Sequence, residues 1–147
     1  MEFSPAPYFE LEDEFALQQK ISALIRKKII RCAHDVSEGG LFVTLCESGF
    51  QNGLGFSVIT SNTIRKDACL FGEGQSRVIM TVNLSDVSAF EAMLHDMPYE
   101  KIGVVTAGEV VVDGDFWGDI SVWKEKYDTA IENYLSKEEA GSALSSI

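Results

Sequence analysis

The chain has none of the features expected of a membrane-spanning or nucleic-acid-binding protein. No apolar run approaches the roughly 20 residues that a helix needs to cross a bilayer. Positive charge is scarce, with 12 Lys and Arg against 23 Asp and Glu and a formal net charge of −11. This balance argues against the basic stripe of a nucleic-acid surface and against docking on anionic lipid. We therefore expect neither a nucleic-acid nor a membrane partner.

Cysteine is also scarce, with Cys32, Cys46 and Cys69 spread widely along the chain. The odd number and the spacing do not suggest a disulfide framework, and no C-x-x-C or H-x-x-x-H pair begins a zinc site. The acidic first 14 residues contain two prolines and do not resemble a signal or transit peptide. We predict reduced thiols, no metal site in this chain and a cytoplasmic location.

What the sequence does contain is a globular composition, because 147 residues with 46% apolar side chains can bury one core. We expect an extended lead-in over residues 1–11, one domain over 12–136 and a flexible tail over 137–147. Apolar residues recur at helical or alternating spacing, and the two patterns follow one another along the chain. This order favours an α/β (α+β) two-layer sandwich with a mixed sheet.

The periodicities predict four helices, five strands and one polar connection. The helices are Glu12–Lys28, Gly40–Ser48, a segment from an N-cap at Ser85 to about Met97, and Ile120–Leu135. The strands are Ile29–Ala33, Leu54–Thr60, Arg77–Asn83, Ile102–Thr106 and Glu109–Val112. We expect the polar connection at Asn62–Cys69.

The first candidate site is the polar loop His34–Gly40, here called the first polar loop. It lies where a strand gives way to a helix, and helix N-termini present N–H groups that bind anions. Two adjacent glycines let the backbone approach a ligand closely. A neighbouring carboxylate would favour a protonated His34, which could pair with an anion or transfer a proton. The alternative is structural: Asp35 or Ser37 caps the helix, and His34 bonds to nearby backbone.

The second candidate is Gly72–Arg77, here called the second polar loop, which lies just before a predicted strand. Its glycines, hydroxyl, amide and guanidinium could form an anion-binding site. Consecutive backbone N–H groups would donate to the anion, and Arg77 would donate to two of its oxygens. Neither a Walker loop nor a dinucleotide fingerprint is present. The alternative is a polar turn with an ion pair between Glu73 and Arg77.

Both loops lie within motifs of a known superfamily. Arg31–Leu41, followed by Leu45 and Glu47, resembles the S-A-H-D-x-S-D/E-G-G-L…L-x-E signature of the AIR synthetase-like superfamily. Leu70–Arg77 is similar to the L-F-x-E-x-Q-S-R motif of formylglycinamidine ribonucleotide (FGAM) synthases of the PurL type. Order and spacing agree from about Leu17 to Leu135. Cys32 and Gly74 depart from the motifs, since serine is usual at both positions, and the loss of a hydroxyl at Gly74 removes one donor.

The resemblance implies an AIR synthetase C-terminal-domain-like fold and a place in purine biosynthesis. FGAM synthase converts formylglycinamide ribonucleotide, ATP and glutamine-derived ammonia into FGAM, ADP and phosphate. ATP and Mg²⁺ belong mainly to an N-terminal domain that this chain lacks, so we expect the chain to bind no cofactor alone and to be inactive in isolation. Implied partners are that domain, a glutaminase and a small bridging subunit in small-form enzymes, and a phosphorylated ribonucleotide substrate.

The resemblance also implies roles for individual residues. His34 and Asp35 would position the reacting region, as tentative catalytic residues. Substrate binding would fall to the rest of the two motifs: Ser37, Gly39, Gly40, Gly72, Glu73, Gly74, Gln75, Ser76 and Arg77. The alternatives are another AIR synthetase-like enzyme, such as AIR synthetase or selenophosphate synthetase, and a non-catalytic assembly module.

Overall fold

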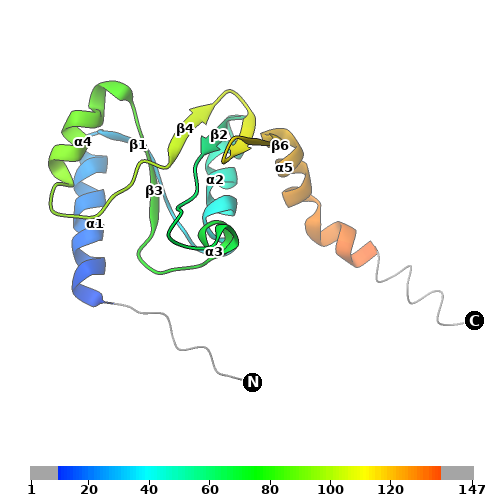
Figure 1. Ribbon diagram of the computed structural model, residues 1–147, viewed down its shortest axis with the longest axis horizontal. Helices are drawn as coiled ribbons and strands as arrows, with labels where there is room; N and C mark the ends of the chain where they lie inside the picture. The colour runs from blue at the N-terminus through cyan, green and yellow to red at the C-terminus, as the bar shows by residue number, and fades with distance from the viewer. Residues whose placement is uncertain (1–9, 137–147) are drawn as a thin grey trace, which may run out of the picture.

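A computed structural model describes residues 10–136, so most of the expected lead-in and the expected tail (1–9 and 137–147) lie outside the described residues. Helices and strands alternate along the chain (Figure 1). The helices are α1 (Leu11–Arg26), α2 (Gly40–Phe50), α3 (Lys66–Phe71), α4 (Val87–Met93), which follows the 3-10 turn η1 (Leu84–Asp86), and α5 (Ile120–Asp128). The strands are β1 (Ile30–Asp35), β2 (Gly55–Val58), β3 (Val78–Val82), β4 (Gly103–Thr106), β5 (Glu109–Val112) and β6 (Asp115–Asp119).

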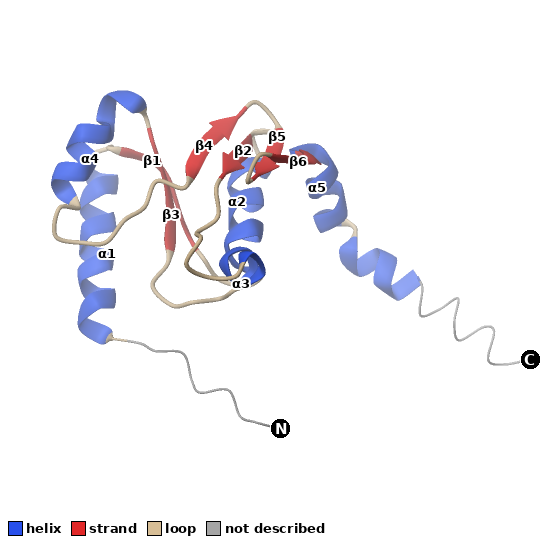
Figure 2. Cartoon of the chain, viewed as in Figure 1, coloured by secondary structure: helices blue, strands red, loops and turns tan. Residues whose placement is uncertain are grey.

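The strands form two sheets, one of them mixed, and the predicted α+β class is confirmed. β1 and β3 make an antiparallel pair, and the other four strands are ordered β4-β2-β5-β6. In the larger sheet β2 and β5 are parallel, whereas the other neighbours are antiparallel. Figure 2 shows α1 and α4 beside the β1–β3 pair, and α2 and α5 beside the larger sheet. No helix within residues 10–136 is long and apolar enough to cross a bilayer.

Three apolar clusters hold these parts together. The largest joins α2, α3 and α5 to the larger sheet: Phe42, Cys46, Phe56, Val58, Leu70, Val110, Val112 and Ile120. The second joins α1, β1 and the end of α4 through Leu24, Ile30 and Leu94. The third is small and consists of Val36, Leu41 and Cys69. Its members come from the first polar loop, α2 and α3, so it lies where the two motifs converge.

Two elements differ from the prediction because they are too short or too irregular to show a period. Helix α3 occupies part of the expected polar connection, and its six residues span less than two turns. Strand β6 was not predicted. Its residues do not alternate cleanly, and its register with β5 shifts at Val110 and Val111. The turn Asp113–Gly114, with φ of 54° and 87°, is the hairpin signal that could have revealed it.

Three further expectations are corrected at helix ends. Ser85 does not cap the third long helix, because residues 84–86 form η1 and α4 begins after Asp86. The predicted helix Ile120–Leu135 is interrupted: α5 ends at Asp128, a turn follows at Thr129, and helical residues resume at 130–136. The first helix begins at Leu11, one residue earlier than predicted.

Candidate functional site

The pairing of β1 with β3 brings the two polar loops together. Asp35 pairs with Val78 at the end of this ladder. Just beyond it, the Val36 N–H donates to the Arg77 carbonyl at 2.8 Å. His34 and Asp35 thus lie on β1 rather than in an open loop. Because these strands are antiparallel, the chain leaves β1 next to the point where it enters β3, and the two motifs meet.

A carboxylate joins the two loops directly. The backbone N–H of Gly39 donates to Glu73 Oε1 at 3.0 Å, although the two residues are 34 positions apart. Gly39 is the N-cap of α2 and has φ of 81°, and no side chain caps this helix. Asp35 and Ser37 therefore do not cap α2, contrary to the structural alternative. Glu73 instead occupies a donor at the helix N-terminus, where negative charge is stabilised.

Gly40 brings α2 against the residues that precede the second polar loop. It is buried, with φ of 68°, and a Cβ built on it would lie 2.6 Å from the Phe71 carbonyl carbon and 2.8 Å from the Leu70 carbonyl oxygen. Only glycine avoids both the left-handed strain and this collision. The close approach of α2 to α3 fixes the spacing between the loops.

Arg77 turns inward and bonds to the backbone. Its guanidinium donates to the carbonyl oxygens of Gly72 at 3.2 Å and Cys69 at 3.4 Å. These acceptors belong to the end of α3 and the residue after it, where carbonyls lack partners within a helix. Arg77 therefore stabilises the second polar loop, and Glu73 bonds to Gly39 rather than pairing with Arg77 as the structural alternative expected.

Ser76 ties the second polar loop to α1. It adopts a left-handed backbone, with φ of 59°, and its hydroxyl donates to Glu14 Oε2 at 2.5 Å. This bond, followed by one from Gln18, lowers the pKa of the Glu14 carboxyl. Ser37, Gly74 and Gln75 are exposed, which leaves the Ser37 hydroxyl and the Gln75 amide accessible from solvent.

His34 contacts groups of its own chain through both ring nitrogens. Nδ1 lies 2.9 Å from the Asp35 carbonyl oxygen, and Nε2 lies 3.5 Å from Glu47 Oε2. The other oxygen of Glu47 accepts a hydrogen bond from the Tyr127 hydroxyl at 2.6 Å. Sequence reasoning did not assign a role to Glu47 or Tyr127. Glu47 could have been found as the acidic residue of the first motif, whereas Tyr127 lies in the predicted helix Ile120–Leu135, whose pattern gives it no polar role.

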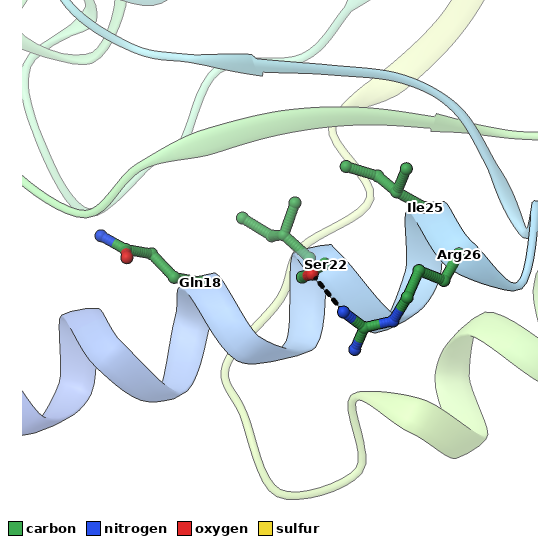
Figure 3. A pocket seen from close by; sticks show the side chains of 5 residues that line it. Gln18, Ser22, Ile25 and Arg26 are labelled. Atoms are coloured by element: carbon green, nitrogen blue, oxygen red, sulfur yellow. Dashed lines mark hydrogen bonds between the residues drawn. The ribbon is translucent and has the colours of Figure 1, made fainter.

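A groove of about 450 Å³ runs beside the second polar loop. This volume falls in the range of small-molecule sites. Its walls include Ile59, Ser61, Ile64, Gly72, Gly74 and Arg77. A second hollow, of about 290 Å³, is lined by α1 alone and contains Gln18, Ser22 and Arg26 (Figure 3). No residue of either polar loop lines that hollow, so the groove is the better candidate for the ligand.

Metal binding finds no support in this part of the chain. Within residues 10–136, no three His, Cys, Asp or Glu side chains are grouped so that they could hold a metal ion. The three cysteines carry free thiols, and Cys46 and Cys69 are buried. The site therefore offers hydroxyl, amide and backbone donors, together with carboxylates that the chain itself engages.

Known proteins are similar to this chain in sequence. Residues 6–114 match the family described as AIR synthase related protein, C-terminal domain. The phosphoribosylformylglycinamidine synthase subunit PurL of Salinibacter ruber is 43% identical over 107 residues, which are 70% of this chain and 14% of that protein. The PurL subunit of Thermus thermophilus is 37% identical over 106 residues, or 69% of this chain and 14% of that protein.

Solved structures show the same fold at low identity. T. maritima PurL complexed with FGAR aligns with a TM-score of 0.61 and 15% identity, covering 74% of this chain and 20% of that one. The hydrogenase maturation protein HypE aligns with a TM-score of 0.54 and 21% identity, covering 66% of this chain and 38% of that one. This chain spans about one seventh of the length of its curated relatives. Because the family match covers most of the sequence, the chain belongs to the family of AIR synthase related protein C-terminal domains.

Proposed function

We propose that the chain forms the substrate-side wall of an FGAM synthase. The observation that carries this proposal is the meeting of the two motifs: the β1–β3 register and the Gly39–Glu73 bond place them side by side. The PurL relatives support the assignment, and a structural neighbour was solved with FGAR. The reaction would consume formylglycinamide ribonucleotide, ATP and ammonia, and release FGAM, ADP and phosphate.

The exposed polar groups of the two polar loops suit a phosphorylated ribonucleotide. The backbone N–H of Gly74 can approach a phosphate closely, and the Gln75 amide and Ser37 hydroxyl can bond to ribose or phosphate oxygens. Arg77 holds the loop that presents these donors. His34 and Asp35 would position the amide that reacts, at the end of β1.

ATP, Mg²⁺ and the ammonia supply belong to other parts of the assembly in this proposal. Structures of T. maritima PurL were solved with ATP and with AMPPCP, which supports a nucleotide site in the longer protein. A glutaminase would release the ammonia, with a small bridging subunit in small-form enzymes. The isolated chain would then be inactive, because the remaining walls of the site and the nucleotide lie outside it.

A chimeric enzyme tests this function. The homologous segment of the Salinibacter ruber PurL would be replaced by this chain, and FGAM formation would be followed with ATP and ammonia. We expect activity above that of the relative with the segment deleted. An inactive but folded chimera would contradict the proposal, and turnover of the AIR synthetase substrate instead would support the alternative enzyme.

Two exposed side chains give sharper variants. We expect Ser37→Ala and Gln75→Ala each to raise the KM for the ribonucleotide by about 3–10-fold, the equivalent of one net hydrogen bond. Both positions are exposed, so stability should change little. Ser88→Ala and Gln19→Ala change the same residue types at exposed positions on α4 and α1, and they should leave KM unaltered. Equal KM values in all four variants would show that Ser37 and Gln75 do not contribute to binding of the ribonucleotide.

A further inference from the structure

Three polar side chains from three separate elements meet at the end of β1. They are His34 of β1, Glu47 of α2 and Tyr127 of α5, here called the polar cluster. One Glu47 oxygen accepts the Tyr127 hydroxyl hydrogen bond at 2.6 Å, and the other lies 3.5 Å from His34 Nε2. His34 and Tyr127 are 93 positions apart in the sequence. The fold alone therefore brings them to the same carboxylate.

The geometry assigns the proton on the His34 ring. The Asp35 carbonyl oxygen, 2.9 Å from Nδ1, can only accept, so Nδ1 carries the proton of that hydrogen bond. Nε2 faces the Glu47 carboxylate at 3.5 Å, so an N–H on this nitrogen would be directed at Glu47. A carboxylate that accepts from an imidazole N–H holds the ring in one orientation.

Tyr127 fixes the carboxylate in turn. Its hydrogen bond to Glu47, and the negative charge of Glu47, raise the pKa of the Tyr127 phenol, so the hydroxyl keeps its proton and remains a donor. The aromatic ring packs against Phe50, with centroids 5.3 Å apart. Glu47 is thus held on one side by a short bond to a ring that is itself packed on α2.

Helix α5 is anchored firmly enough to serve as the outer support of this cluster. Ile120 is buried in the largest apolar cluster. The Trp123 ring lies 4.9 Å from Phe42 and donates its indole N–H to the Trp117 carbonyl at 3.0 Å. The family match ends at residue 114, before both β6 and α5. A residue outside the matched segment therefore reaches the first motif.

We propose that Glu47 and Tyr127 are positioning residues, which hold the His34 ring and, through its bond to the Asp35 carbonyl, the start of the first polar loop. This inference rests on the proposed function, because the loop is taken to contact the ribonucleotide. Neither residue needs to touch the substrate. Their effect is to hold the ring in one orientation, with Nδ1 directed at the Asp35 carbonyl, and to present one defined arrangement of the loop for the chemical step.

Nuclear magnetic resonance on the chain itself tests the positioning independently of any reaction. The sequence has two histidines, so ring nitrogens labelled with ¹⁵N give signals for His34 and His95 alone. We expect the His34 signals to report a proton on Nδ1, and we expect Glu47→Gln and Tyr127→Phe to shift the signal of Nε2, the nitrogen that faces the carboxylate, more than that of Nδ1. His95 signals should stay in place in every variant. Unchanged His34 signals in both variants would overturn the inference.

Matched controls separate this effect from general disturbance of the helix. Tyr134→Phe and Glu132→Gln make the same chemical changes at exposed positions within the helical residues 130–136, and they should leave the His34 signals unaltered. Urea unfolding should confirm that all variants remain folded. A shift produced equally by a control and by Tyr127→Phe would also overturn the inference.

The kinetics of the chimeric PurL test the positioning role in the reaction itself. Loss of a partner that orients a metal-binding side chain typically lowers activity about 10–100-fold. By analogy, we expect Tyr127→Phe and Glu47→Gln to lower kcat by about 10–100-fold, while the KM for the ribonucleotide changes less than about twofold. Changes confined to KM, or kcat values equal to those of the control variants, would overturn the positioning role. If the chimera makes no FGAM while the His34 signals respond as expected, the proposed function fails and the assignment of the His34 ring stands.

Discussion

Replacing Gly40 with alanine would test how tightly α2 packs against the residues that precede the second polar loop. The residue is buried with φ of 68°, and a Cβ there would lie 2.6, 2.7 and 2.8 Å from three backbone atoms of Phe71 and Leu70. Left-handed backbone costs a non-glycine residue roughly 1–2 kcal/mol. Overpacking against backbone, which cannot rotate away, adds about 1–3 kcal/mol. We expect Gly40→Ala to lower the free energy of unfolding by about 2–5 kcal/mol.

Gly53 offers a matched control for the strain alone. Its φ is 63°, and a Cβ built there meets nothing within 4 Å. Gly53→Ala should therefore cost only the backbone term of roughly 1–2 kcal/mol. Urea unfolding followed by tryptophan fluorescence would measure both variants, and for a domain of this size each kcal/mol lowers Tm by roughly 2–4 °C. If the two variants lose the same stability, the contact of Gly40 with Phe71 does not constrain the loops.

Three further perturbations test the packing and the charges. The pKa of Asp113 is lowered to about 2, first by the Lys66 hydrogen bond and then by the Thr60 N–H. Its stabilising effect is therefore complete above the unfolded pKa of about 4 and is lost as the pH falls toward 2. In Asp113→Asn, the urea midpoint should therefore decrease less between about pH 4 and about pH 2 than it does in the unmodified chain. Burial raises the pKa of the Cys46 thiol to about 12, so Ellman's reagent at about pH 8 should modify it only after unfolding, whereas the partly exposed Cys32 reacts in the native chain. Phe42→Ala should cost about 3–5 kcal/mol in urea unfolding and reduce the near-ultraviolet circular dichroism, because the ring packs on Trp117 and Trp123; a loss below 1 kcal/mol would contradict the packing.

The sequence predicted the elements that have a clear period. Strand β5 was predicted at its observed bounds, Glu109–Val112, and β3 lies within the predicted strand Arg77–Asn83. In both, β-branched residues follow one another and turn residues bound the segment. The six residues of α3 and the irregular strand β6 gave no such pattern, and the division of the strands into two sheets depends on pairings between distant segments. No local signal specifies that β1 pairs with β3 rather than with β2.

The site was predicted at the level of segments and missed at the level of contacts. The two motifs mark the correct stretches because glycine and polar residues interrupt the apolar periodicity there. Their partners could not be read from the sequence, since Glu73 bonds to Gly39 across 34 positions and Tyr127 bonds to Glu47 across 80. The substrate-binding roles given to individual residues stay predictions, which the chimera variants test.

The observed bonds indicate how strongly this chain can bind a ligand by itself. An anion that takes the Gly39 N–H must displace the Glu73 carboxylate, and one that takes the Arg77 guanidinium must displace two carbonyl oxygens. Each exchange replaces one hydrogen bond with another, so the net gain is a small part of the strength of the new bond. Displacing Glu73 also brings two negative charges close together. Under the proposed function, tight binding of a phosphorylated ligand would therefore depend on cations and further walls supplied from outside these two loops.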